Sequence, residues 1–163
     1  MGLFSFITDA GSKLGGEIFD VTHATEEAIP STVTPEQIDT ARAQSITDNI
    51  AKSAVLVEDL VVTVNGPAAL LAGKVNTQAC SEKLTLIAGN QFGIGNVDCQ
   101  LEVANPEPES IIYTVKSGDT LGKIAKAEYG DASKYTLIFE ANQPILQDPD
   151  KIYVGQNLRI PTL

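Results

Sequence analysis

The chain has 163 residues, 43% of them hydrophobic, which is material for one domain or for two small domains with modest cores. Its formal net charge is −10, and the charge is unevenly placed: 13 acidic and 5 basic residues in 1–104, two acidic residues in 105–111, and six of each sign in 112–163. This balance disfavours nucleic acid, which needs a basic face. An acidic surface attracts small cations only diffusely and otherwise serves solubility.

The titratable side chains offer few catalytic or metal-binding combinations. Cys80 and Cys99 have no second cysteine or histidine at ligand spacing, so we expect reduced, partly buried core residues. His23 is the sole histidine, which removes most metal and catalytic-triad schemes. The chain also has neither a nucleophile elbow nor a phosphate-binding glycine loop with its lysine. The sequence therefore predicts a protein that is not an enzyme.

The first residues combine hydrophobic side chains with features that argue against export. There is no cationic leader, Asp9 interrupts the apolar run, and no stretch reaches membrane-spanning length. We therefore expect a cytoplasmic protein that binds neither nucleic acid nor membrane. Leu3, Phe4, Phe6 and Ile7 are expected to pack on the protein's own first domain. The alternative, an amphipathic helix lying on a membrane, lacks the basic face that would attract anionic lipid.

Residues 35–104 predict a compact α+β layer, and 15–34 predict a loop. The expected elements are a helix from Pro35, capped by Thr34 and with the apolar stripe Ile38, Ala41, Ile46, Ile50 and Ala54; a strand within 55–64; a strand over 69–75; a helix over 81–88 ended by Gly89-Asn90; and a strand over 95–103. The order α-β-β-α-β places both helices on one face of the sheet.

Residues 112–163 predict a second small unit of β-α-α-β order. Tyr113 to Val115 are strand formers, Ser117-Gly118 is a turn pair, and Asp119 or Thr120 can cap a helix that begins at Leu121. A second apolar run follows at Tyr135, Ile138 and Phe139 and stops at Asn142-Gln143-Pro144, before a closing strand at 158–160. The proline-containing segment 105–111 is the expected linker.

Both halves resemble known families. YTVKSGDTL, YGD, EANQP and GQNLRIP make 113–161 similar to a LysM module, and VTVNGPAALLAGKVNTQACSEKLTLIAGNQFGIGNVDCQLEV resembles a BON domain. Together with MGLFSFITDAGSKL they resemble the bacterial cytoplasmic potassium-binding proteins of BON–LysM architecture. The implied division is 1–34 as an N-terminal segment packing on the BON domain, 35–104 as the BON domain, 105–111 as the linker and 112–163 as the LysM domain. Segment 15–34 departs from the resemblance.

This resemblance implies a potassium site. Proteins hold potassium with backbone carbonyls that replace its water shell, and carbonyls converge where glycines let the chain leave regular structure. Two such places are 7–12 and 89–95, where the expected ligands are the backbone carbonyls of Ile7, Ala10, Gly11, Ser12, Gly89 and Gln91. Rubidium or caesium would substitute for potassium. The alternative reading is that Gly11 and Gly89 simply end helices.

The LysM resemblance implies a second candidate site. In that family, two loops bind glycans that contain N-acetylglucosamine, such as peptidoglycan. The matching residues are Ser117, Gly118, Asp119, Thr120, Leu121, Pro144, Ile145 and Ile152. We favour an intramolecular contact with the BON domain, in which potassium binding compacts the two domains. The alternative is an envelope-associated interaction protein that binds glycan and contacts a membrane or a partner.

Overall fold

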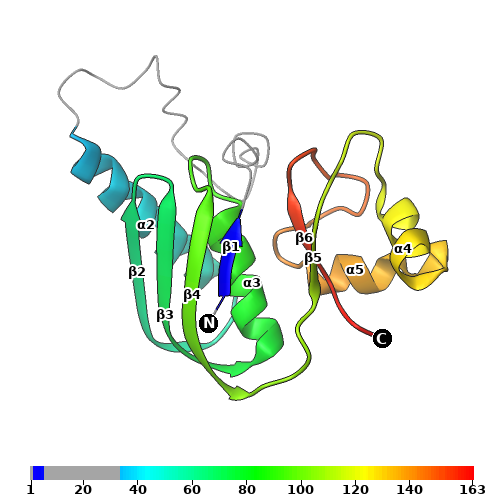
Figure 1. The fold of residues 1–163 in the computed structure, drawn as a ribbon, viewed down its shortest axis with the longest axis horizontal. Coiled ribbons are helices and arrows are strands. Elements are labelled where there is room, and N and C mark those ends of the chain that lie inside the picture. The colour runs from blue at the N-terminus through cyan, green and yellow to red at the C-terminus, as the bar shows by residue number, and fades with distance from the viewer. Residues whose placement is uncertain (1, 6–33) are drawn as a thin grey trace.

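The protein has the predicted α+β fold in two small domains (Figure 1). The structure is a computed structural model, which describes residues 2–5 and 34–163. The first domain contains β1 (Gly2–Ser5), α2 (Pro35–Lys52), β2 (Val57–Asn65), β3 (Ala68–Thr77), α3 (Gln78–Gly89) and β4 (Asn96–Asn105). The second contains β5 (Ile111–Thr114), α4 (Leu121–Tyr129), the short 3-10 helix η1 (Ala132–Lys134), α5 (Tyr135–Ala141) and β6 (Asn157–Ile160). Residues 106–110 join them.

Helix α2 begins where the sequence predicts and ends earlier than its apolar stripe. The Thr34 side chain accepts a hydrogen bond from Gln37 N, the Gln37 side chain accepts one from Thr34 N, and Pro35 occupies the first turn. The helix stops at Lys52, and Ala54 adopts a left-handed φ of 57°. The inclusion of Ala54 in the helical stripe was therefore wrong, because a left-handed residue cannot continue a right-handed helix.

The first domain is built on a four-stranded sheet of order β1-β4-β3-β2. Strands β2 and β3 form an antiparallel hairpin, and α3 connects β3 to its parallel neighbour β4. The unpredicted strand is β1, which pairs antiparallel with β4, with Gly2 opposite Cys99 and Ser5 opposite Asn96. The backbone of 2–5 therefore joins the first domain as an edge strand, whereas Phe6 and Ile7, two of the residues expected to pack on it, lie outside the described residues.

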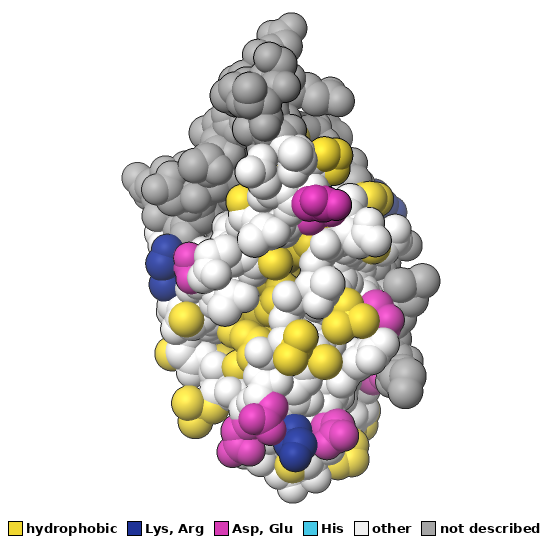
Figure 2. All heavy atoms as spheres, turned by 90° about the vertical axis from the view of Figure 1, so that its left-hand side faces the viewer, with side chains coloured by type: hydrophobic (Ala, Val, Ile, Leu, Met, Phe, Trp, Pro, Cys, Tyr) yellow, Lys and Arg dark blue, Asp and Glu magenta, His cyan; other side chains and the backbone are white. Residues whose placement is uncertain are grey.

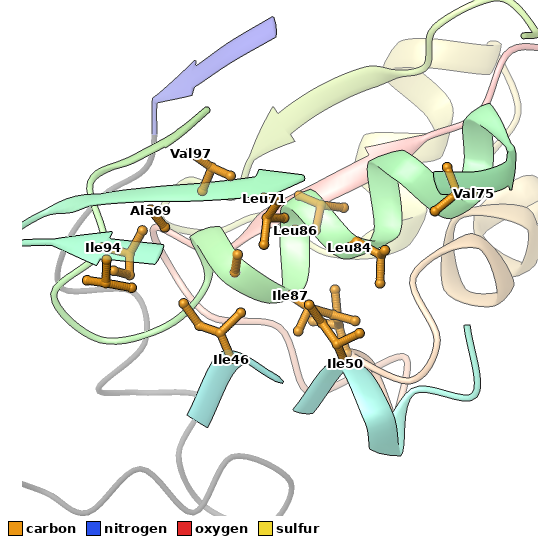
Figure 3. Close-up of a cluster of buried hydrophobic side chains, with 13 residues drawn as sticks. Ile46, Ile50, Ala69, Leu71, Val75, Leu84, Leu86, Ile87, Ile94 and Val97 are labelled. Atoms are coloured by element: carbon orange, nitrogen blue, oxygen red, sulfur yellow. The ribbon is translucent and has the colours of Figure 1, made fainter. Parts of the chain in front are cut away.

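The core of the first domain lies between the sheet and its two helices. Figure 3 shows Ile46 and Ile50 of α2 lying toward Leu84 and Ile87 of α3, and Leu71 of β3 belongs to the same buried cluster. Removing such apolar surface from water is the main stabilising contribution in a domain of this size. Both cysteines are free thiols at this layer, as predicted: Cys99 is buried and Cys80 is half-buried.

Strand β2 forms the outer edge of the sheet and is irregular. Its pairing with β3 shifts between Glu58 and Val61, and Asp59 has a φ of 52°. Gly73 of β3 lies against this bulge, because a Cβ there would come within 2.8 Å of the Glu58 carbonyl oxygen. Leu56, just before β2, and Val61 within it are exposed. Figure 2 shows that the side of the molecule on the left of Figure 1 carries several hydrophobic side chains. A bulge with two carboxylates is a common protection of an exposed edge strand.

The second domain has its own buried hydrophobic cluster, together with short-range helix caps and a buried amide that ties α5 to β6. Thr120 caps α4 by accepting from Lys123 N, and Gly130 ends that helix with a left-handed φ of 74°. The wholly buried Asn142 follows α5. Its Nδ2 donates to the carbonyls of Ile138 and Arg159, and its Oδ1 accepts from Arg159 N, each at 2.7 Å. The helix end predicted at Asn142 is therefore also the attachment point of β6.

Candidate functional site

The loop at the end of α3 is the centre of the candidate site. Helix α3 continues through Gly89, and its cap residue Asn90 has a φ of −85°. Gly89 is therefore the last helical residue, and the helix ends at Gly89-Asn90 as predicted, with Asn90 rather than Gly89 as its cap. The left-handed glycine is Gly93, with a φ of 80°. Gly89, Asn90, Gln91, Ile94 and Gly95 are buried, so the loop belongs to the interior of the protein.

Several backbone carbonyls of this loop are uncommitted. Within the described residues, the carbonyl oxygens of Gly89, Asn90, Phe92 and Gly93 accept no hydrogen bond, whereas Gln91 O accepts one from Ile94 N at 3.2 Å. Helix α3 carries no basic residue in its last turn. The C-terminal end of a helix carries the negative end of its dipole and attracts cations. Carbonyl oxygens are the ligands that replace the water shell of a large monovalent cation. The loop has the chemistry of a cation site rather than an anion site.

The strand register places the end of β1 beside the same loop. Ser5, the last residue of β1, lies opposite Asn96, the first residue of β4, and Asn96 directly follows the loop. The chain therefore leaves β1 at the end of the sheet where 89–95 lies. Of the six predicted ion ligands, Gly89 and Gln91 lie in this loop. The other four predicted ligands, Ile7, Ala10, Gly11 and Ser12, lie outside the described residues.

Polar side chains of the loop connect it to the second domain. Asn90, 2% exposed, donates from Nδ2 to Asn157 O at 3.1 Å and accepts from Asn157 N at 3.0 Å through Oδ1. The side-chain amide of Asn90 thus bonds both backbone groups of Asn157, the first residue of β6, as the backbone of a neighbouring strand would. Gln91, next to it, is 4% exposed, and its Nε2 finds no partner among the described residues. A buried amide of this kind is costly without a partner.

A buried ion pair joins the domains at the other end of α3. Arg159 Nε of β6 donates to Glu82 Oε2, and Ser110 N, at the end of the connecting segment, donates to Glu82 Oε1 at 2.9 Å. Glu82 is 4% exposed. Sequence reasoning missed Glu82, Arg159 and Asn90, because their partners lie 28 to 77 positions away and no local pattern marks them.

This ion pair should make the domain contact sensitive to acid. Burial alone would raise the pKa of Glu82, but the hydrogen bonds from Ser110 and Arg159, with the Arg159 charge, hold it below its ordinary value of 4.5. A carboxylate whose pKa is lower in the folded state than in the unfolded state stabilises the fold at pH values above the unfolded-state pKa. This stabilisation is lost as the pH falls through the folded-state pKa. We expect the urea midpoint of unfolding to decline more steeply below about pH 4.5 in the wild type than in Glu82→Gln. Parallel pH profiles of the two proteins would contradict this assignment.

The predicted glycan-binding residues are divided between the two domains' cores and the surface. Ser117, Gly118 and Thr120 are exposed, and Pro144 and Ile152 are half-buried. Leu121 is part of the core of the second domain, whereas Ile145, 6% exposed, belongs to the buried cluster of the first domain. The loop that follows α5 is thus partly used in contact between the domains.

Asp119 has a structural role in the other predicted glycan loop. Its Oδ2 accepts from Lys116 N at 2.8 Å and from the Tyr113 hydroxyl at 2.9 Å. The bond from Lys116 N is the main reason that the pKa of Asp119 is below its usual range, and the Tyr113 hydroxyl adds to it. The carboxylate fixes the turn between β5 and α4.

The described residues lack two other kinds of site, a cluster of metal-binding side chains and a membrane-spanning helix. Among residues 2–5 and 34–163, no three His, Cys, Asp or Glu side chains are grouped so that they could share a metal ion. No helix in the same part of the chain combines the length and the apolar character needed to cross a membrane.

Comparison with known proteins gives matches to the whole chain and to its second domain. Residues 113–161 match the family model of the LysM domain. The chain is 40% identical over 162 residues, 99% of both chains, to the potassium binding protein Kbp of Escherichia coli O6:H1. It is 34% identical over 111 residues, 61% of this chain and 43% of the relative, to an uncharacterized protein of Deinococcus radiodurans.

A shorter match involves an enzyme. The chain is 49% identical over 53 residues to an esterase of Mycobacterium tuberculosis, which is 32% of this chain and 11% of the esterase. That match is confined to the LysM region, whereas the match over the whole chain is to a protein named for potassium binding. The prediction that this chain is not an enzyme is confirmed.

Proposed function

Because the chain belongs to the same family as the potassium binding protein Kbp, we propose that it binds a potassium ion as a cytoplasmic ion sensor. The ion is held by backbone carbonyls of 89–95 together with those of Ile7, Ala10, Gly11 and Ser12. Potassium is large and gives up its water readily, so neutral carbonyl oxygens suffice to hold it. Rubidium and caesium, which are larger still, substitute for it.

The observation that carries this proposal is the uncommitted carbonyls at the C-terminal end of α3, beside the point where β1 ends. Phe92 and Gly93 offer oxygens with no hydrogen-bond donor among the described residues, in a loop that is mostly buried. Phe92 and Gly93 are half-buried, so their carbonyls need water or another ligand to satisfy them. A bound cation does so, and the helix dipole adds to its attraction.

The second domain serves as the reporter of ion binding in this proposal. Asn90 lies in the loop 89–95, called the ion loop below, and is hydrogen-bonded to Asn157 of β6. A change in the conformation of this loop therefore alters the contact between the domains. Ion binding and domain docking are then linked, and each strengthens the other by the same factor. The first domain acts as the BON-like half, on the basis of its α2-β2-β3-α3-β4 order.

Glycan binding by the LysM domain is the second candidate function. It is favoured by the family match over 113–161 and by the exposure of Ser117, Gly118 and Thr120. It is opposed by Ile145, because this residue of the second loop is buried in the first domain's cluster. A glycan containing N-acetylglucosamine, such as peptidoglycan, would therefore bind in competition with docking of the two domains.

The proposed function is tested by comparing alkali cations at matched ionic strength. A ligand at 100 times its Kd stabilises the native state by about 2.7 kcal/mol, which raises the Tm of a chain of this size by roughly 5–11 °C. We expect this rise in potassium, rubidium and caesium chloride. Sodium and magnesium, which hold their water more tightly, should give little of it. Equal Tm values in sodium and potassium chloride would refute potassium binding.

A further inference from the structure

We infer that Arg42 of α2 is a positioning residue for the ion loop: its guanidinium fixes Gly93 and joins the loop to the β2–β3 turn. This inference rests on the proposed function, since it assigns a role in presenting the carbonyls of 89–95. Arg42 lies 47 to 53 positions before the loop and has no counterpart among the residues that the sequence suggested. The structure brings it there through the packing of α2 against the end of the sheet.

The first part of the arrangement is the attachment of Arg42 to the β2–β3 turn. Arg42 Nη1 donates to Gly66 O at 3.3 Å, and Gly66 N donates to Asp39 Oδ2 at 2.9 Å. Asp39 Oδ1 lies 3.7 Å from Arg42 Nη1, one helical turn away on α2. Asp39 and Arg42 therefore hold both backbone groups of Gly66, and the carboxylate offsets much of the charge on the guanidinium.

The second part is the contact between Arg42 and the ion loop. A Cβ on Gly93 would lie 2.5 Å from Arg42 Nη2 and 2.9 Å from Arg42 Cζ, so the guanidinium rests on the bare α-carbon. Gly93 also has a φ of 80°, which favours glycine independently of the contact. Gly93 lies next to Phe92, and the carbonyls of both accept no hydrogen bond from the part of the chain that the structure describes. Their directions follow from the backbone conformation that Arg42 covers.

The third part is the backbone attachment of the loop, to which Arg42 adds a side-chain support at Gly93. Pro67 O accepts from Gly95 N at 2.8 Å and from Asn96 N at 3.0 Å, which fixes the end of the loop. Gln91 N donates to Ala88 O, which fixes its beginning. Between these points Ile94 N donates to Gln91 O at 3.2 Å, and the Arg42 side chain covers Gly93 inside that turn. Loss of that side chain frees the carbonyls while both ends of the loop stay in place.

Removal of Arg42 should change the potassium affinity in the direction opposite to the one that charge repulsion alone would give. A cationic side chain near a cation site repels the ion, so its removal would tighten binding if charge were its main effect. If Arg42 positions the loop, its removal weakens binding. Residues that orient metal ligands from behind typically change affinity by about 10- to 100-fold when they are replaced. We expect Arg42→Met, which keeps the length and loses the fork of donors, to lower potassium affinity by about tenfold.

The experiment measures the potassium Kd by calorimetry and the Tm in sodium chloride for the full chain. Lys52→Met is the matched control, because it removes a positive charge from the exposed last turn of the same helix. The control should keep its potassium affinity, and Arg42→Lys should recover little of the loss because an ammonium lacks the guanidinium's planar fork. A merely structural role would lower the Tm in sodium and potassium chloride equally, whereas a positioning role also reduces the difference between them.

Asp39→Asn supplies a second test if Arg42→Met does not fold. It keeps Arg42 but weakens its tether, so we expect a smaller loss of potassium affinity in the same direction. Unchanged or tighter potassium binding in the folded variants would overturn the role of Arg42 while leaving the proposed function intact. A wild-type protein with no response to potassium would overturn both.

Discussion

Replacing Glu82 with alanine should lower the free energy of unfolding by about 3–5 kcal/mol, the range expected when one partner of a buried ion pair is removed. The substitution leaves the Arg159 guanidinium, whose side chain is 12% exposed, without its carboxylate. It also removes the acceptor of Ser110 N, at the point where the connecting segment enters β5. Unpaired buried groups pay their full desolvation cost, so the loss exceeds the net strength of the pair.

Chemical denaturation of four proteins measures this effect: wild type, Glu82→Ala, Arg159→Met and the double variant. The double variant should be more stable than the sum of the single losses predicts, because it leaves neither charge buried alone. A matched control is Glu128→Ala in α4, which removes an exposed carboxylate from the other domain. A loss below about 1 kcal/mol in Glu82→Ala, as exposed pairs give, would show that the pair does not hold the domains.

The elements whose signals lie within a few residues could be predicted from the sequence. Thr34 and Pro35 start α2, Thr120 starts α4, and Asn142 ends α5, because caps and turns depend on backbone groups three or four positions away. Strand β1 could not be predicted in this way. It is four residues long at the sheet edge, and its partner β4 lies more than 90 positions away.

The candidate site likewise has a part with a local sequence signal and a part that depends on distant residues. Glycine spacing identified the loop 89–95, because a chain that leaves regular structure there needs glycines. It could not show that Gly89 is helical and Gly93 is left-handed, or that Arg42 covers Gly93. Those facts depend on how α2 packs against the end of the sheet. The burial of Ile145 in the other domain's core likewise follows from tertiary docking, which no local pattern encodes.

Replacing Ile145 with aspartate should separate the two domains. Its side chain is 6% exposed within the first domain's cluster, so the variant either buries an unpaired carboxylate or opens the contact. An unpaired buried charge costs at least about 3 kcal/mol. Opening is the cheaper outcome, because each domain keeps its own core. Leu137→Asp is the matched control, since Leu137 of α5 is 37% exposed and the charge change is identical.

Small-angle scattering and potassium titration of these two variants test the linkage between docking and ion binding. A fully compact chain of 163 residues has a radius of gyration of about 15 Å. We expect a larger radius for Ile145→Asp than for Leu137→Asp. Because linkage is reciprocal, undocking should also weaken potassium binding, since Asn90 then loses Asn157 and the ion loop loses one of its supports. If Ile145→Asp expands the molecule and keeps wild-type potassium affinity, the loop binds its ion independently of the LysM domain, and that domain does not report ion binding.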